Sequence, residues 1–334
     1  MKIADFWKKI DGSAVQCSLC PHNCVIKLGQ KGICGVRQNI DGKLYSLNYF
    51  VASSGNLDPI EKKPLYHFMP GSSILSLGTF GCNFSCKFCQ NYSISKEFSD
   101  SRLGNPNFNK EEIIENLKQY KNHKNFAGLA YTYNEPTIWA ETITELGDEV
   151  RSLGLKNVFV TNGFINTEPL DHFLEFGDAF NIDLKAITED FYKNLCGGKL
   201  LPVLNTIKKV REKAHLELTT LIIPTLNDST EEFEKLRDWI VENVGENTPI
   251  HLSRYYPTYK LNFPPTPVET LVLARDILKE KLNYVYIGNT GNEQNTLCAN
   301  CGETVINRTG YSTEILALDA EGKCKKCGNK IAEM

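Results

Sequence analysis

The feature that most constrains the fold of this 334-residue chain is the alternation of short apolar runs with longer helical segments between residues 74 and 287. The runs have the length and composition of strands, and they comprise residues 74–78, 126–132, 157–160, 180–184, 216–223, 250–253 and 284–287. Three of the helices open on a capping pair: Asn109 with Glu112, Ser229 with Glu232, and Thr266 with Glu269. Repeated strand–helix units give a parallel sheet with right-handed crossovers, and six or seven units are too few to close an eight-fold barrel. The sequence therefore predicts an α/β fold, an open and partial (β/α)6-type TIM barrel.

Polar residues gather where these strands end, which is the edge where the chemistry of such a barrel lies. They include Asn134, Glu135, Asn162, Asp183, Lys185 and His251. Taken singly, each also fits a structural role: Asp183 with Lys185 as an ordinary pair, and His251 as a hydrogen-bonded core histidine. Because they converge from successive strands, we expect them to line one site.

Three cysteines directly after the first strand have the spacing C-x3-C-x2-C: Cys82, Cys86 and Cys89. Thiolates this close together can hold three irons of a 4Fe–4S cluster, whereas most such clusters have four cysteine ligands. A cluster one ligand short has an open iron, and an open metal position is where a substrate binds or is activated. The alternative is a structural zinc loop whose fourth ligand is distant in sequence, although zinc ligands usually come as two short pairs.

The other cysteines, from a total of twelve, form two groups of four and one single residue. These are the N-terminal group Cys17, Cys20, Cys24 and Cys34, the C-terminal group Cys298, Cys301, Cys324 and Cys327, and the single Cys196. The C-terminal spacing C-x2-C-x22-C-x2-C closes a four-sulfur site, with zinc in a ribbon as the default occupant and rubredoxin-type iron as the alternative. The N-terminal group can bind zinc or a second iron–sulfur cluster, and spacing alone does not decide between them.

Composition narrows the class of protein. A net charge of −3 argues against a broad nucleic-acid surface. No apolar run reaches the ~18 residues of a membrane span, and the N-terminus lacks a signal peptide. We therefore expect a cytoplasmic protein, where grouped cysteines bind metal more often than they form disulfides. The cysteine groups suggest three parts: an N-terminal metal-binding module (1–70), the partial barrel (71–292) and a C-terminal zinc-ribbon or rubredoxin-like module (293–334).

The cluster loop, with Phe88 just before its last cysteine, resembles that of radical S-adenosylmethionine (SAM) enzymes. The chain is similar to members close to the glycyl-radical-enzyme and pyruvate formate-lyase activating enzymes, and within them to the AmmeMemoRadiSam system radical SAM enzymes. The matching segments are residues 17–24, 58–67, 81–92, 131–137, 251–257, 286–289 and the final ribbon.

The resemblance implies roles for individual residues. The three loop cysteines bind the 4Fe–4S cluster, and Phe88 packs beside the adenine of SAM. The segment with Asn134 and Glu135 binds the SAM amino group, where Glu135 either accepts a hydrogen bond from that group or orients the loop that does. The remaining contacts with SAM come from Asn162, Asp183, Lys185 and His251.

The implied reaction is reductive cleavage of SAM to a 5′-deoxyadenosyl radical, which abstracts hydrogen from an unactivated carbon of the substrate. An electron donor, flavodoxin or ferredoxin, is implied, and association with Memo-like and AMMECR-like proteins suggests a shared pathway. Cys196 is a candidate hydrogen donor to a product radical, or else a small apolar filler. Two other functions stay open: an activase acting on a partner protein, and a non-enzymatic zinc-ribbon scaffold.

Overall fold

The computed structural model describes residues 1–290 and 294–334. Within these residues the main sheet has eight strands in the order β14-β13-β12-β11-β10-β9-β8-β7. Their bounds are β7 Ser54–Pro59, β8 Ser73–Gly78, β9 Phe126–Tyr131, β10 Lys156–Thr161, β11 Ala179–Asp183, β12 His215–Ile222, β13 Ile250–Arg254 and β14 Val285–Gly288. Neighbours from β8 to β14 are parallel, and β7 adds an antiparallel edge. The predicted open α/β barrel is confirmed.

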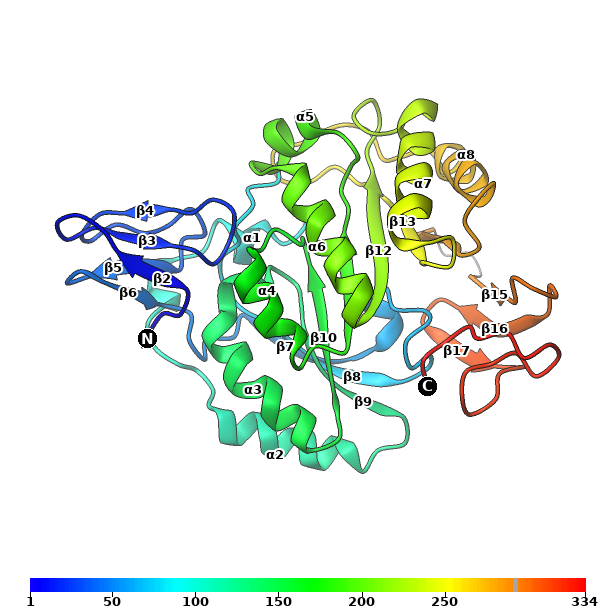
Figure 1. Cartoon of the computed structure of the whole chain (residues 1–334), viewed down its shortest axis with the longest axis horizontal. Helices are drawn as coiled ribbons and strands as arrows, with labels where there is room; N and C mark the ends of the chain where they lie inside the picture. The colour runs from blue at the N-terminus through cyan, green and yellow to red at the C-terminus, as the bar shows by residue number, and fades with distance from the viewer. Residues whose placement is uncertain (291–293) are drawn as a thin grey trace.

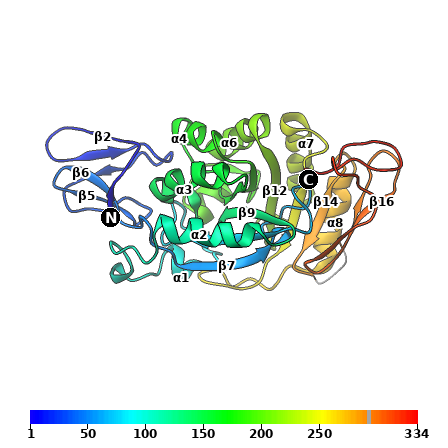
Figure 2. The same cartoon turned by 90° about the horizontal axis from the view of Figure 1, so that it is seen from below.

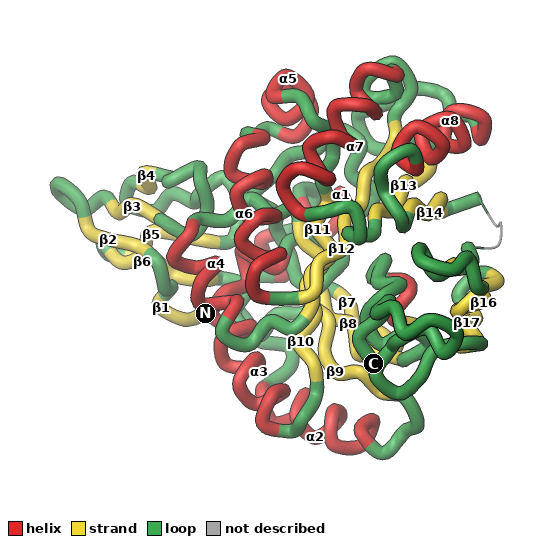
Figure 3. Tube along the Cα trace, turned by 45° about the vertical axis from the view of Figure 1, so that its right-hand side comes forward, coloured by secondary structure: helices red, strands yellow, loops and turns green. Residues whose placement is uncertain are grey.

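Helices cover the outer face of this sheet (Figures 1 and 3). The covering helices are α2 Lys110–Lys121, α3 Ala140–Ser152, α4 Thr167–Leu174, α6 Leu200–Lys213, α7 Thr230–Val244 and α8 Val268–Lys279. Two short helices, α1 Tyr92–Ser95 and α5 Glu189–Phe191, lie in the loops that follow β8 and β11. Short helical turns are η1 Ile60–Lys62, η2 Asp100–Arg102, η3 Pro136–Trp139 and the π-helical η4 Tyr192–Cys196. None of the helices in the described part of the chain has the length and apolarity needed to cross a membrane.

The helix starts agree with the capping prediction in two cases out of three. Asn109 and Glu112 form the full capping box of α2, and the Ser229 side chain accepts from the backbone N–H of Glu232 at the start of α7. The prediction for α8 is wrong. Thr266 is buried, and its hydroxyl donates to the carbonyl of Ile222 at 2.6 Å instead of capping the helix.

The open interior of the barrel is filled by the segment that follows β7. Ile60, Leu65 and Phe68 pack against inward-facing residues of the strands, such as Ala130 and Val158. This apolar plug closes the end of the barrel away from the strand C-termini, so space for ligands is left at the opposite end.

Two small all-β modules flank the barrel on opposite sides (Figures 1 and 2). The N-terminal module contains β1 Lys2–Ile3, β2 Trp7–Lys9, β3 Val15–Cys17, β4 Val25–Ile26, β5 Arg37–Ile40 and β6 Lys43–Ser46. The C-terminal module contains β15 Thr296–Leu297, β16 Thr304–Thr309 and β17 Ser312–Ile315. The predicted boundary between residues 292 and 293 lies outside the described residues, and β7 pairs with the barrel although it precedes residue 70.

Candidate active site

The loop that follows β8 starts with a glycine that no other residue can replace without strain. Gly81 has φ +95°, and a Cβ there would lie 2.7 Å from the carbonyl oxygen of Cys34. The Gly81 N–H donates to the carbonyl of Ile94 at 2.9 Å, and Lys96 Nζ donates to the carbonyl of Cys82 at 2.7 Å. The segment around α1 therefore holds the loop at two points before it reaches its second cysteine.

The middle of this loop is bonded to η4. The backbone N–H of Ser85 donates to the carbonyl of Cys196 at 2.8 Å, and that of Lys87 donates to the carbonyl of Leu195 at 2.9 Å. Because Ser85 and Lys87 flank Cys86, these two bonds fix the backbone from which the Cys86 thiol projects.

The three thiols of the loop line a cavity of about 230 Å³ at the C-terminal ends of the strands. Nine of the residues predicted to bind the cluster or SAM line it together: Cys82, Cys86, Cys89, Phe88, Asn134, Glu135, Asn162, Asp183 and Lys185. Successive parallel strands bring their carboxyl ends to one edge, which is why residues so far apart in sequence meet here. Their individual roles as ligands stay predictions.

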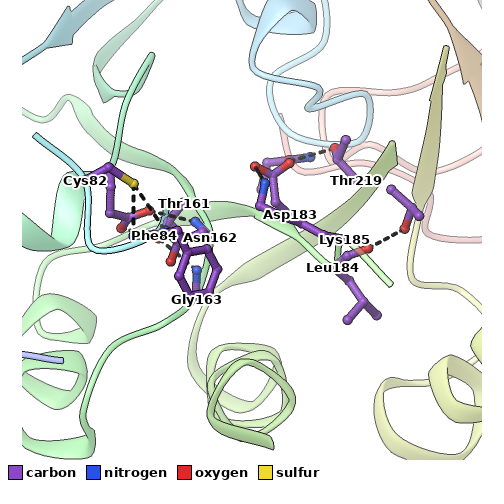
Figure 4. A network of polar contacts seen from close by, with 12 residues as sticks. Cys82, Phe84, Thr161, Asn162, Gly163, Asp183, Leu184, Lys185 and Thr219 are labelled. Carbon is purple, nitrogen blue, oxygen red and sulfur yellow. Dashed lines mark hydrogen bonds and ion pairs between the residues drawn. The ribbon is translucent and has the colours of Figure 1, made fainter. Parts of the chain in front are cut away.

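Asp183 and Lys185 form an ion pair at the end of β11, with Lys185 Nζ 2.9 Å from Asp183 Oδ2 (Figure 4). Burial works against the charge of Lys185, but Asp183 and the Cys86 thiol outweigh it and hold the Lys185 pKa well above its ordinary value. The ammonium also lies 5.9 Å from the centre of the Phe88 ring. A permanently charged ammonium on the cavity wall is suited to bind a carboxylate.

Glu135 is buried, and both of its carboxylate oxygens accept hydrogen bonds from the chain. Oε1 accepts from Thr137 N at 2.9 Å and from Thr161 Oγ1 at 2.7 Å, and Oε2 accepts from Asn162 N at 2.8 Å. Burial raises the pKa of Glu135, and these donors offset part of the rise. The carboxylate ties the end of β9 to the end of β10, so of its two predicted roles this geometry favours orienting the loop.

Two asparagines connect the strand ends to the cysteine loop. Asn134 Oδ1 accepts from Thr79 N at 3.1 Å, and its Nδ2 donates to the Gly81 carbonyl at 2.7 Å. Asn162 Nδ2 lies 3.8 Å from Cys82 Sγ (Figure 4). Both side chains therefore stabilise the loop that carries the thiols.

The donor set of the cavity fits a four-iron cluster with an open position. Burial raises the pKa of the Cys82 and Cys89 thiols, so their thiolates need a bound cation to form. In the part of the chain that the structure describes, no fourth cysteine lines the cavity, and the buried Cys196 thiol contacts Cys86 from outside it. The neighbouring amide, carboxylate and ammonium groups leave polar partners for the amino acid end of SAM.

Two predicted site residues do not line this cavity. His251 is buried lower on β13, where its Nε2 lies 2.7 Å from Glu217 Oε2 and its ring stacks on Tyr286. Ser253, two residues further along the same strand, lines the cavity instead. Cys196 is completely buried at the end of η4, a position that matches its role as a small filler better than that of a donor to a substrate.

Sequence reasoning missed several lining residues. Gln90 and Asn91 directly follow the last loop cysteine, and Asn289 directly follows β14. Asn91 Nδ2 donates to the Tyr133 carbonyl at 2.5 Å. Their position next to motif residues and strand ends was the available signal.

The two remaining cysteine groups differ in spacing. The ligand atoms of Cys298, Cys301, Cys324 and Cys327 lie within 4.8 Å of one another, so this group can bind a metal ion, either zinc or iron. The sulfur pairs Cys298–Cys327 and Cys301–Cys324 are 3.4 and 3.8 Å apart. The N-terminal four, Cys17, Cys20, Cys24 and Cys34, line one small cavity with Arg37.

Comparison with known proteins gives the family. Residues 77–240 match the radical SAM superfamily model, and they include the cysteine loop and most of the strand ends that form the cavity. An uncharacterised protein of Methanocaldococcus jannaschii is 43% identical over 337 residues, covering 99% of both chains. The chain belongs to the radical SAM superfamily. Membership implies a 4Fe–4S cluster and SAM as cofactors, and the cavity residues described above fit both.

Within the superfamily the chain is related to glycyl-radical-enzyme activating enzymes. A putative activating enzyme of M. jannaschii is 31% identical over 175 residues, which are 51% of this chain and 63% of that protein. The pyruvate formate-lyase 1-activating enzyme of Escherichia coli is 23% identical over 217 residues, covering 60% and 86% of the two chains. Among solved structures, a radical SAM methyltransferase from Sphaerobacter thermophilus matches with a TM-score of 0.51 and 15% identity over 65% of this chain and 66% of that one, a likeness that shows the fold alone.

Proposed function

We propose that this radical SAM enzyme cleaves SAM by one-electron reduction and removes a hydrogen atom from a substrate held beside the SAM cavity. The observation that carries the proposal is the single cavity of about 230 Å³ that holds three thiols and the Asp183–Lys185 pair. When bound, the cluster supplies the electron that splits SAM into methionine and the 5′-deoxyadenosyl radical.

The chain itself contributes binding and orientation. Lys185 pairs with the SAM carboxylate, since its ammonium is charged and faces the cavity. Glu135 and Asn134 position the loop through their bonds to Thr161 and Gly81. Phe88 is buried and gives the adenine an apolar surface.

A second cavity, of about 540 Å³, is suited to the substrate. Asn91, Tyr133, Asn134 and Asp183 line both cavities, so a molecule in the second lies directly beside the first. This adjacency supports transfer of a hydrogen atom over a short distance.

The charged far wall of the second cavity favours a small polar substrate. Lys63 Nζ lies 2.8 Å from Asp58 Oδ2, and Lys62 Nζ lies 3.2 Å from Asp58 Oδ1. Asp183 adds a second carboxylate to the lining, so two ammonium groups and two carboxylates face this cavity. The C-terminal module adds Tyr311 to the same lining.

A glycyl-radical activase that acts on a partner protein is the second candidate, favoured by the similarity to a putative activating enzyme. We also propose, from the AmmeMemoRadiSam resemblance, that the reaction belongs to a pathway with Memo-like and AMMECR-like proteins. A flavodoxin or ferredoxin would deliver the electron.

Anaerobic reconstitution with iron and sulfide, followed by incubation with SAM and dithionite, tests the reaction. We expect 5′-deoxyadenosine from the wild-type protein and none from the variant with Cys82, Cys86 and Cys89 all replaced by alanine. Cys324→Ala, a cysteine change in the separate C-terminal group, serves as the control, and it should keep the product. Equal product from the triple variant would exclude the proposed function.

A further inference from the structure

We infer that Cys17, Cys20, Cys24 and Cys34 hold a second 4Fe–4S cluster, closed by four cysteines, and not a zinc ion. The four residues line one small cavity between β3, β4 and the start of β5. Their chemistry identifies a thiophilic metal centre, and the arrangement of their sulfurs separates the two candidates.

Sulfur spacing distinguishes a single ion from a cluster. A tetrahedral zinc ion with Zn–S bonds of about 2.3 Å places its sulfurs roughly 3.8 Å apart. The C-terminal cysteines meet this requirement, with sulfur pairs at 3.4 and 3.8 Å. In a four-iron cluster each thiolate binds a different iron, so the sulfurs stand further apart around a larger centre.

The N-terminal cysteines follow the second pattern. Among residues 1–290 and 294–334, the C-terminal four are the only group with at least three His, Cys, Asp or Glu ligand atoms within 4.8 Å of one another. The N-terminal four therefore share a cavity without approaching as closely as a single ion demands. The three cysteines of the radical SAM loop, which are placed for a four-iron cluster, behave in the same way.

A buried arginine supplies the second, independent observation. Arg37 is 1% exposed and lines the same cavity. Its Nη2 bonds the Asp5 carbonyl and lies 2.9 Å from Glu141 Oε1, but its Nε and Nη1 are buried without a hydrogen-bond partner. Buried N–H donors are rarely left unpaired in proteins. Sulfur atoms of a cluster in this cavity would accept these bonds.

The inferred cluster would lie next to the radical SAM loop. His22, which lines the N-terminal cavity, has Nε2 2.8 Å from the carbonyl of Asn83. Lys96 Nζ donates to the carbonyls of both Ile33 and Cys82, at 3.3 and 2.7 Å. These contacts join the two cysteine loops, so the second cluster would form part of the same metal-containing core.

The test counts iron and inorganic sulfide in the Cys82, Cys86 and Cys89 triple alanine variant after anaerobic reconstitution. We expect about four irons and four sulfides per chain, with the Mössbauer spectrum of a four-iron cluster. Adding Cys24→Ala should abolish this cluster, whereas adding Cys324→Ala, the matched control in the other group, should leave it. A triple variant that contains zinc and no sulfide, or two or fewer irons with sulfide, would overturn the inference.

The wild-type protein gives a second readout that does not depend on the fold of any variant. We expect about eight irons and eight sulfides per chain. Addition of SAM should change the EPR signal of only one of the two reduced clusters, because four cysteines leave no open iron on the other. Four irons per chain together with two zinc ions would contradict the inference.

Discussion

Individual side chains on the cavity wall fall into two kinds. Glu135 and Asn134 form hydrogen bonds with the chain itself. Glu135 accepts from Thr161 Oγ1, and Asn134 donates to the Gly81 carbonyl. Among the residues that the structure describes, Lys185 has only Asp183 as a charged partner within 4 Å, and it still faces the cavity. Glu135 and Asn134 therefore position the cysteine loop, whereas the Lys185 ammonium is free to bind a ligand.

Lys185→Met should weaken SAM binding by about 1.5–3 kcal/mol, because a charge-assisted bond to the SAM carboxylate is lost. Cluster content should stay unchanged, since Lys185 is not an iron ligand. Calorimetric titration of the reconstituted protein with SAM measures the change, and Lys193→Met on the nearby η4 controls for loss of a lysine. Equal dissociation constants for the Lys185 variant and wild type would disprove this role.

Among the elements, η4 is the support that the sequence did not predict. Its last two carbonyls hold Ser85 and Lys87 of the cysteine loop. It ends at Gly197, which has φ +72°, and a Cβ there would collide with Ser85 Oγ. The loop conformation therefore depends on a turn more than a hundred residues later in the chain.

Gly197→Ala should lower both stability and iron content. The positive φ alone costs an L-residue about 1–2 kcal/mol, and the Ser85 hydroxyl in the cysteine loop must also move away from the new Cβ. Gly12→Ala is the matched control, since Gly12 has φ +68° and no atom within 4 Å of the new Cβ. Urea unfolding and iron analysis check both variants. Full iron content in Gly197→Ala would show that cluster binding does not depend on the conformation of this turn.

Local sequence signals predicted the parallel strands and the α2 cap because these depend on apolar runs and on neighbours three residues apart. The β7 strand was missed because its sequence, Ser54–Pro59, contains Gly, Asn, Asp and Pro, which are poor strand formers. The backbone hydrogen bonds of its antiparallel pairing with β8 stabilise the strand although its residues have low strand propensity. The α8 cap was wrong because Thr266 bonds Ile222, a partner that is 44 residues away in sequence.

Across the whole molecule, the segment after β7 connects the barrel to the C-terminal module. The backbone N–H groups of Tyr66 and His67 donate to Glu217 Oε1 inside the barrel, at 2.8 and 2.7 Å. On the other side Arg308 is buried, with its guanidinium 4.3 Å from the centre of the Tyr66 ring. His67 Nδ1 donates to the carbonyl of Ile331 at 2.7 Å. The module at the end of the chain therefore stabilises the segment after β7, which also carries Lys62 and Lys63 of the second cavity.

Stability should fall as the pH drops from 6.5 toward 4. Burial lowers the pKa of His67 to about 4, so the unfolded chain takes up a proton in this range that the folded protein excludes. The neutral ring already uses both nitrogens, with Tyr286 and Ile331. The difference between the His67 pKa in the unfolded and the folded protein corresponds to a loss of about 3 kcal/mol in the free energy of unfolding.

Urea unfolding at several pH values checks this expectation. His67→Gln should lose much less stability across the range than wild type, whereas the exposed His123→Gln, the matched control, should follow wild type. Parallel curves for wild type and His67→Gln would contradict the assignment.

Cys324→Ala should remove about one metal ion per chain and loosen the segment after β7. The closed four-sulfur site has no position for a substrate, so its effect should be on stability and not on the spectrum of the radical SAM cluster. Elemental analysis and hydrogen exchange of residues 61–69 measure the two effects. Lys326→Ala, an exposed change in the same module, should cause neither, and loss of an iron–sulfur signal with Cys324→Ala would argue against a purely structural site.

The candidate site was predictable to the extent that strand ends define it. Nine of the proposed residues meet because parallel strands place their carboxyl ends at one edge. His251 does not, because its depth along β13 and its bond to Glu217 depend on the packing of the barrel interior. The lysine wall of the second cavity also follows from tertiary packing, since Asp58 lies on the unpredicted β7.

The most direct test of the account is electron–nuclear double resonance on the reduced, reconstituted protein with SAM that carries 17O in its carboxylate and 15N in its amino group. We predict hyperfine coupling of both labels to a four-iron cluster, because the open iron beside Cys82, Cys86 and Cys89 would bind both groups. Absence of coupling from either label, with a cluster signal that SAM does not alter, would contradict the claim that this cavity holds SAM on an open iron.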